Sequence, residues 1–155
     1  MFLLGQYLGK WFEQERYFTF YEEVGRCWQG EYFIDYETGG LSAKLTFNDV
    51  LLNKPTDIVI DVFAKDPYYA PNRLTYTIRG VPFFEDNYEV LATDYETFTI
   101  EYACKNIPFL GHITFAWILT RSPHPTIDVI WRAKSAMNYL DIDTSLLQRT
   151  PQTCY

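Results

Sequence analysis

Hydrophobic and polar residues alternate with period two along most of the chain. Between residues 41 and 47, for example, apolar side chains occupy the odd positions and mainly polar ones the even positions. Such alternation is typical of a strand with one buried and one solvated face. The pattern predicts eight strands, over residues 11–16, 27–36, 41–47, 56–63, 73–79, 88–93, 97–104 and 113–120.

Short turn segments separate these strands. Examples are residues 37–40, which contain two glycines, and the Asp66-Pro67 pair. The connections are too short for crossover helices, so neighbouring strands should run antiparallel. Eight strands are enough to close an up-and-down barrel around one small ligand. We therefore expect an all-β fold, an eight-stranded antiparallel up-and-down β-barrel over about residues 9–121, in a single domain spanning residues 1–155.

One segment near the C-terminus has the period of a helix instead. Apolar residues recur there at steps of three and four, at Ile127, Ile130, Ala133, Met137 and Leu140. This spacing predicts an amphipathic α-helix over about residues 125–139, packed on the outside of the barrel. A C-terminal tail over residues 140–155 follows it.

Composition and charge narrow the functional classes. The 155 residues are 19% aromatic and carry a net charge of −7. The negative charge disfavours a nucleic-acid partner, and the aromatic content favours a large β core or an aromatic-lined cavity. No stretch reaches the roughly 18 apolar residues of a membrane span. The apolar start of the chain lacks a charged leader and a cleavage site, so it is not a complete signal peptide.

Signals of catalysis are sparse. The two histidines, His112 and His124, lie in predicted loops, and no Cys/His spacing suits a metal. There is no phosphate-binding glycine loop and no nucleophile elbow. We expect binding without turnover, with no catalytic residue, no metal and no required cofactor. Four acidic residues near the first strand are expected to form a solvated face, namely Glu13, Glu15, Glu22 and Glu23.

Three short motifs occur in a familiar order. Gly9-Lys10-Trp11 opens the first strand, Thr93-Asp94-Tyr95 forms a late turn, and Arg121 ends the eighth strand. Their order and spacing resemble the signatures of the lipocalins across nearly the whole chain. Residues 7–11, 25–27, 91–96, 102–104 and 115–119 are most similar to the branch of apolipoprotein D and the insect Lazarillo and bilin-binding proteins. The resemblance implies structural roles for six residues of the three signatures, namely Gly9, Trp11, Thr93, Asp94, Tyr95 and Arg121. The Arg121 guanidinium stacked on the Trp11 indole should plug the closed end of the barrel.

Three cysteines allow at most one intramolecular disulfide. The resemblance implies that Cys27 pairs with Cys154, while the family partner of Cys104 lies in a segment before the first strand. Cys104 is therefore expected to be a free thiol. Such a bridge implies an oxidising compartment and hence a secreted protein. A reactive catalytic cysteine, as in the prostaglandin-isomerising lipocalins, is the alternative; no histidine or basic run lies near Cys104 in sequence to lower its pKa.

The resemblance also implies that Trp117 lines a cavity. Period two then places Phe115 and Leu119 inside, and the same argument places Tyr32 inside with Trp28, Gly30 and Ile34. The expected lining is completed by Leu45, Phe47, Ile60, Tyr76, Tyr88, Ile100 and Tyr102.

This apolar cup with scattered phenols suits a small hydrophobic ligand such as a fatty acid, a steroid-like molecule, a retinoid or a bilin. Extracellular transport of that ligand is the leading hypothesis. The alternative function is a pigment-bearing structural protein, holding a bilin or carotenoid, that forms homo-oligomers. The rings could also fill the barrel and leave no cavity.

Three predicted loops at the open end carry apolar residues, at positions 18–21, 81–84 and 107–110. Turns are normally polar, so these tips suggest a contact surface for a membrane, a lipoprotein or a second copy of the chain. The alternative is that they fold inward as a lid.

Overall fold

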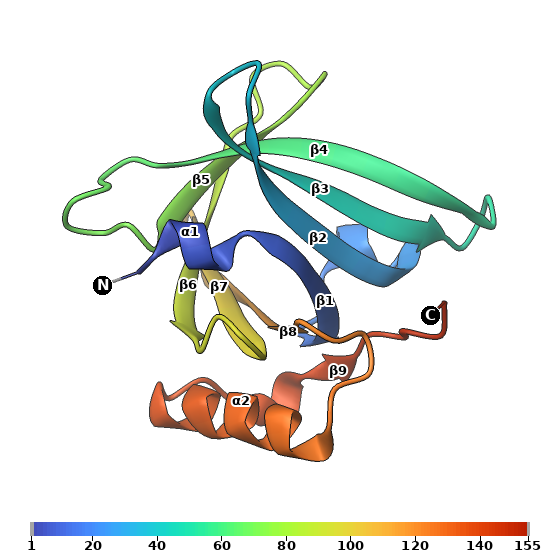
Figure 1. Cartoon of the computed structure of the whole chain (residues 1–155). Helices are drawn as coiled ribbons and strands as arrows, with labels where there is room; N and C mark the ends of the chain where they lie inside the picture. The colour runs from blue at the N-terminus through green and yellow to red at the C-terminus, as the bar shows by residue number, and fades with distance from the viewer. Residues whose placement is uncertain (1, 155) are drawn as a thin grey trace.

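The computed structural model describes residues 2–154 as an antiparallel β-barrel with one long helix outside it (Figure 1). The barrel strands are β1 (Gly9–Arg16), β2 (Gly25–Asp35), β3 (Gly40–Asp49), β4 (Lys54–Ala64), β5 (Arg73–Ile78), β6 (Asp86–Thr93), β7 (Phe98–Ile107) and β8 (Gly111–Thr120). Consecutive strands pair, and β1 pairs with both β2 and β8, which closes the sheet. The predicted eight-stranded up-and-down barrel is confirmed. A two-residue strand, β9 (Gln148–Arg149), adds to β1 and was not predicted.

The predicted C-terminal helix is confirmed as α2 (Ile127–Tyr139). It packs on the outer face of β7 and β8 through Ala133 and Met137, which are fully buried. Ile127 was expected on this packing face but is exposed at the start of the helix. Three one-turn helices were missed because they are too short to show a period: α1 (Leu4–Tyr7), η1 (Phe20–Glu22) and η2 (Thr144–Leu146). No helix within residues 2–154 is long and apolar enough to cross a bilayer.

The first signature motif lies at the closed end of the barrel, where α1 precedes β1. The guanidinium of Arg121 lies 3.7 Å from the centre of the Trp11 ring. Gly9 has a φ of 95°, which favours glycine, and a Cβ there would come within 3.2 Å of the Arg121 Nη1. Arg121 also donates hydrogen bonds to the carbonyl oxygens of Gln6, Leu8, Lys10 and Tyr95. One side chain thus ties three segments together.

The second motif forms the turn between β6 and β7. The Thr93 hydroxyl donates to the carbonyl of Phe98, and the Asp94 carboxylate accepts backbone N–H groups from Thr97 and Phe98. Arg132 of α2 lies 3.1 Å from the same carboxylate. Partial burial acts to raise the pKa of Asp94, but the hydrogen bonds from Thr97, the backbone and Arg132 outweigh it and lower the pKa to about 2. The turn therefore also anchors the helix.

The C-terminal tail completes the barrel wall. β1 and β2 pair over only four residues of each strand, and the tail lies between them beyond that point. The Gln152 side-chain amide donates to the carbonyls of Glu13 on β1, at 2.7 Å, and Trp28 on β2, at 2.8 Å. The expected Cys27–Cys154 disulfide is present and joins residues 127 positions apart. The tail is thus held in the wall by hydrogen bonds and by a covalent bond.

Candidate functional site

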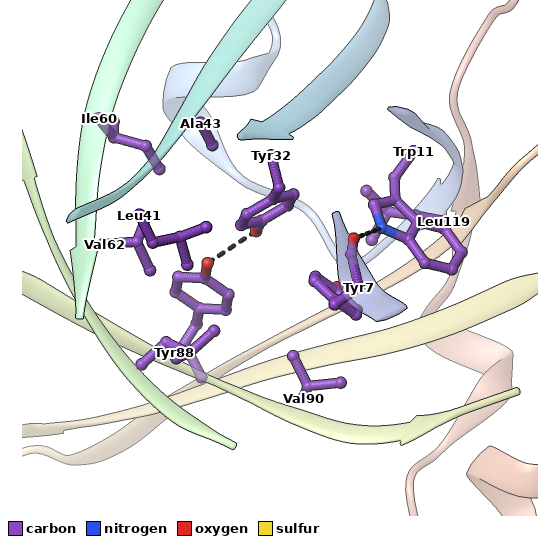
Figure 2. Close-up of a cluster of buried hydrophobic side chains, with 12 residues drawn as sticks. Tyr7, Trp11, Tyr32, Leu41, Ala43, Ile60, Val62, Tyr88, Val90 and Leu119 are labelled. Atoms are coloured by element: carbon purple, nitrogen blue, oxygen red, sulfur yellow. Dashed lines mark hydrogen bonds between the residues drawn. The ribbon is translucent and has the colours of Figure 1, made fainter. Parts of the chain in front are cut away.

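The part of the barrel interior nearest the closed end is a dense layer of buried side chains (Figure 2). Tyr7, Trp11, Tyr32 and Tyr88 dominate it. Closer to the mouth, the inward-facing residues packed against this layer are only half-buried: Leu45, Ile58, Tyr76, Ile78, Phe115 and Trp117. These side chains each keep a minor part of their surface accessible, so protein does not cover the inward face completely at this level. We refer to the buried layer as the floor and to the partly accessible region between it and the mouth as the cup.

A hydrogen-bonded cluster of phenols surrounds one carboxylate in this floor. Tyr7 donates to Glu101 Oε1 at 2.7 Å, and Tyr32 donates to the same oxygen at 3.1 Å. The Tyr32 and Tyr88 hydroxyls are 2.7 Å apart, and the Tyr7 hydroxyl lies 3.2 Å from that of Thr99 (Figure 2 shows the Tyr32–Tyr88 bond). Five side chains from α1, β2, β6 and β7 thus form one network.

Burial sets the protonation of this cluster. Desolvation raises the pKa of Glu101 to about 7, although the hydrogen bonds from Tyr7 and Tyr32 act in the opposite direction. Desolvation also raises the pKa of Tyr7, Tyr32 and Tyr88 well above the usual value of a phenol, and the Glu101 charge adds to the effect. The three phenols therefore keep their protons, and Glu101 changes charge near neutral pH.

Glu101 was missed because the parity expected for β7 is wrong. Ile100 and Tyr102 were expected inside the barrel, but they belong to the apolar cluster on the outer face of the sheet. Ile100 is fully buried in that cluster, which also contains Ala133 and Met137 of α2. Because the helix covers this outer face, β7 turns its apolar residues outward and Glu101 inward.

Most of the other expected lining residues lie on the inner face, at different depths. Tyr32, Tyr88, Ile60 and Leu119 are buried in the floor, whereas Trp117, Phe115, Tyr76 and Leu45 line the cup. Phe47 is buried and stacks on Trp28 with ring centres 4.1 Å apart. A Cβ on Gly25 would come within 2.3 Å of the Phe47 ring, so the stack requires this glycine. Ile34 was expected inside but is exposed near the end of β2.

The acidic residues near the first strand are mostly buried, contrary to expectation. Arg16 lies 2.8 Å from Glu13 and 3.6 Å from Glu22, and all three side chains are almost inaccessible to solvent. Glu22 Oε1 accepts a 2.8 Å hydrogen bond from Trp117 Nε1. Burial and the nearby Glu13 raise the pKa of Glu22 to about 10. A buried charge needs a partner, and Arg16 is the partner of the Glu13 carboxylate, whereas Glu22 stays protonated at neutral pH. Local sequence reveals neither arrangement. Of the four residues, only Glu23 remains exposed.

Apolar loop tips lie at one end of the barrel, because alternate connections of a meander share an end. Phe20, Phe83 and Phe109 are almost fully exposed, in the β1–β2, β5–β6 and β7–β8 connections. Leu51 in the β3–β4 connection is equally exposed and was not predicted. Phe84 instead packs beside Tyr76, with the centres of the two rings 5.8 Å apart. Most tips therefore point to solvent rather than closing as a lid.

Two further features concern metal ligands and the free thiol. Among residues 2–154, no group of three or more His, Cys, Asp or Glu is placed to hold a metal ion. Cys104 is free and exposed, on the outer face of the barrel wall.

Comparison with known proteins gives consistent relatives. The sequence matches no protein-family model. It is 30% identical to apolipoprotein D of Bos taurus over 156 aligned residues, which cover 97% of the chain and 77% of the relative. It is 31% identical to the bilin-binding protein of Pieris brassicae over 145 residues, covering 86% of the chain and 68% of the relative.

Solved structures resemble the fold. Insecticyanin from Manduca sexta superposes with a TM-score of 0.86 at 24% identity, covering 97% of this chain and 80% of the other. Apocrustacyanin C2 superposes with a TM-score of 0.79 at 21% identity, covering 96% and 79%.

Proposed function

Since the chain belongs to the lipocalin family, we propose that it binds and carries a small hydrophobic ligand in the part of its barrel nearest the open end. The observation that carries this proposal is the set of partly accessible, inward-facing apolar side chains between the phenolic floor and the mouth. Apolar surface that water reaches in a concave site gains free energy when a ligand covers it. No chemical step is required of the protein, so binding is proposed to occur without turnover.

The proposed contact residues are those of the cup and its floor. Trp117 is central, because its ring is partly accessible while its Nε1 donates a hydrogen bond to Glu22. A steroid-like molecule, a retinoid, a fatty acid or a bilin would each present the apolar surface that such a cup covers. The Cys27–Cys154 disulfide supports an extracellular site of action, because such bonds persist in oxidising compartments.

Titration of intrinsic fluorescence and of heat tests this proposal. Retinol, a fatty acid and biliverdin should each be added to the wild type, to Trp117→Ala and to Trp131→Ala. At least one ligand should bind saturably, and Trp117→Ala should weaken it about tenfold or more through lost apolar contact. Trp131 is exposed on α2, so Trp131→Ala is the matched control and should bind like the wild type. Absence of saturable binding for every ligand would refute the carrier function.

A pigment-bearing role is the second candidate, favoured by the similarity to a bilin-binding protein. In this role the bound chromophore gives colour, and oligomers form through the apolar tips at the mouth. Protein purified from its native source should then show a visible absorption band that is lost on extraction of the ligand. Colourless native protein that contains a bound lipid would favour the carrier instead.

The exposed tips Phe20, Phe83 and Phe109 are the proposed contacts with a membrane or lipoprotein surface. Aromatic side chains at the entrance of a ligand cup would let an apolar ligand pass between lipid and barrel without crossing water. Phe109→Asp should reduce co-sedimentation with lipid vesicles, whereas Tyr139→Asp, on the exposed face of α2, should not.

A further inference from the structure

We propose that Glu101 makes the floor of the cup a hydrogen-bond acceptor site. The protein then selects apolar ligands whose buried end is an alcohol or an amine over ligands that end in a carboxylate. This inference rests on the proposed function and specifies the class of ligand. It is carried by the geometry around Glu101 and by the charges that face the interior.

One oxygen of Glu101 is available to a ligand. Oε1 accepts the hydrogen bonds from Tyr7 and Tyr32, whereas Oε2 has no hydrogen-bond partner among residues 2–154. Oε2 is not fully buried, so it contacts solvent. Glu101 is the cross-strand partner of Trp117, and adjacent partners in a sheet point to the same face. The free oxygen therefore lies beside the indole at the base of the cup.

Glu101 also lacks a cation. The other acidic side chains of the interior have one: Glu13 is 2.8 Å from Arg16, and Asp86 is paired with Lys105. No ion pair is formed by Glu101 within the described chain. A partly desolvated carboxylate without a cation beside it is unfavourable, and a donor on the ligand would relieve that cost.

The phenols around Glu101 have no proton left for a ligand. Tyr7 and Tyr32 donate to Glu101, so the bond between Tyr32 and Tyr88 must use the proton of Tyr88. The Tyr76 hydroxyl at the cup wall donates its proton to Asp86 Oδ2 in a hydrogen bond of 3.5 Å. The polar groups of the floor thus present acceptors. A ligand carboxylate would meet an acceptor surface and a like charge, which disfavours its binding head first.

Three ligands with the same chain test the inference: decylamine, decan-1-ol and decanoic acid, each titrated calorimetrically at pH 8. The wild type should bind the amine and the alcohol about tenfold more tightly than the acid, as expected for one hydrogen bond to a charged group. Glu101→Gln should remove this selectivity. Glu31→Gln is the matched control, because Glu31 lies on β2 between the inward-facing Gly30 and Tyr32 and so faces outward.

Each outcome has a defined meaning. Equal or tighter binding of the acid by the wild type would overturn the inference, as would unchanged selectivity in Glu101→Gln. Glu101→Met, similar in length but without a carboxylate, provides a second variant and should also bind all three ligands alike. Binding of all three without selectivity refutes this inference alone. Binding of none also refutes this inference, and it refutes the carrier function only if retinol, the fatty acid and biliverdin fail to bind as well.

Discussion

Removal of the Cys27–Cys154 disulfide should destabilise the protein by up to about 5 kcal/mol. The bond joins residues 127 positions apart, so it restricts most of the unfolded chain. In the chain-entropy model, a loop of this size removes roughly 16 cal/mol/K from the unfolded state, which is about 5 kcal/mol at 25 °C. The effect acts on the unfolded state, so the barrel should still fold without the bond.

The native contacts of the tail indicate why the reduced barrel should remain closed. The Cys27 N–H donates to the Pro151 carbonyl at 2.8 Å, and the Thr150 N–H donates to the Gln14 carbonyl at 2.9 Å. Gln152 adds two further bonds to the wall. Loss of such buried bonds would cost about 1–3 kcal/mol each, so the tail should stay in place when the sulfurs are separated.

Urea unfolding followed by tryptophan fluorescence measures the effect. The double variant Cys27→Ser/Cys154→Ser should be compared with its parent in a Cys104→Ser background, which removes the free thiol from both. The midpoint should fall and the urea dependence should become steeper, because an unrestricted unfolded chain exposes more surface. Cys104→Ser alone should match the wild type within about 0.5 kcal/mol, since Cys104 is exposed. A loss below about 1 kcal/mol with unchanged steepness would refute the entropic reasoning.

Two further predictions concern titration and oxidation. The folded-state pKa of Glu101 is raised from 4.5 to about 7 by burial, so its protonation stabilises the fold below pH 4.5 and this contribution is lost as the pH rises through 7. The wild type should therefore lose up to about 3 kcal/mol relative to Glu101→Gln between pH 4.5 and 8; parallel pH profiles in urea unfolding would contradict this. Oxidised protein should form some Cys104-linked dimer that reductant reverses and that Cys104→Ser lacks. Peptide mapping that finds Cys27 or Cys154 as the free thiol would overturn that assignment.

The barrel was predictable because period two is a local signal repeated over eight strands. Each strand alternates over five or more residues, which is long enough to detect, and the observed strands mostly begin or end within a few residues of their expected bounds. β9 and the one-turn helices are shorter than one useful period, so they left no pattern. Their positions depend on tertiary contacts, such as that of the tail with the gap between β1 and β2.

The buried charges near the mouth depend on residues far apart in sequence. Glu13 and Arg16 are close along β1, but their burial depends on Glu22 from the β1–β2 connection and on Thr150 from the tail. Arg16 Nη1 donates to the Thr150 hydroxyl at 2.9 Å across 134 positions of sequence. A rule based on local charge therefore predicted solvent exposure where the folded chain brings partners together.

The orientation of β7 shows how a correct fold can still give a wrong site. β8 is apolar on both faces, with Ala116 and Ile118 under the helix and Trp117 toward the cup. A strand buried on both faces marks the part of the wall that a helix covers, and its neighbour must share that cover. The apolar positions of β7 then belong outside, because α2 needs an apolar surface, and the alternating polar position Glu101 belongs inside. Placement of the amphipathic helix before assignment of strand faces would thus have identified Glu101 as an inward-facing carboxylate.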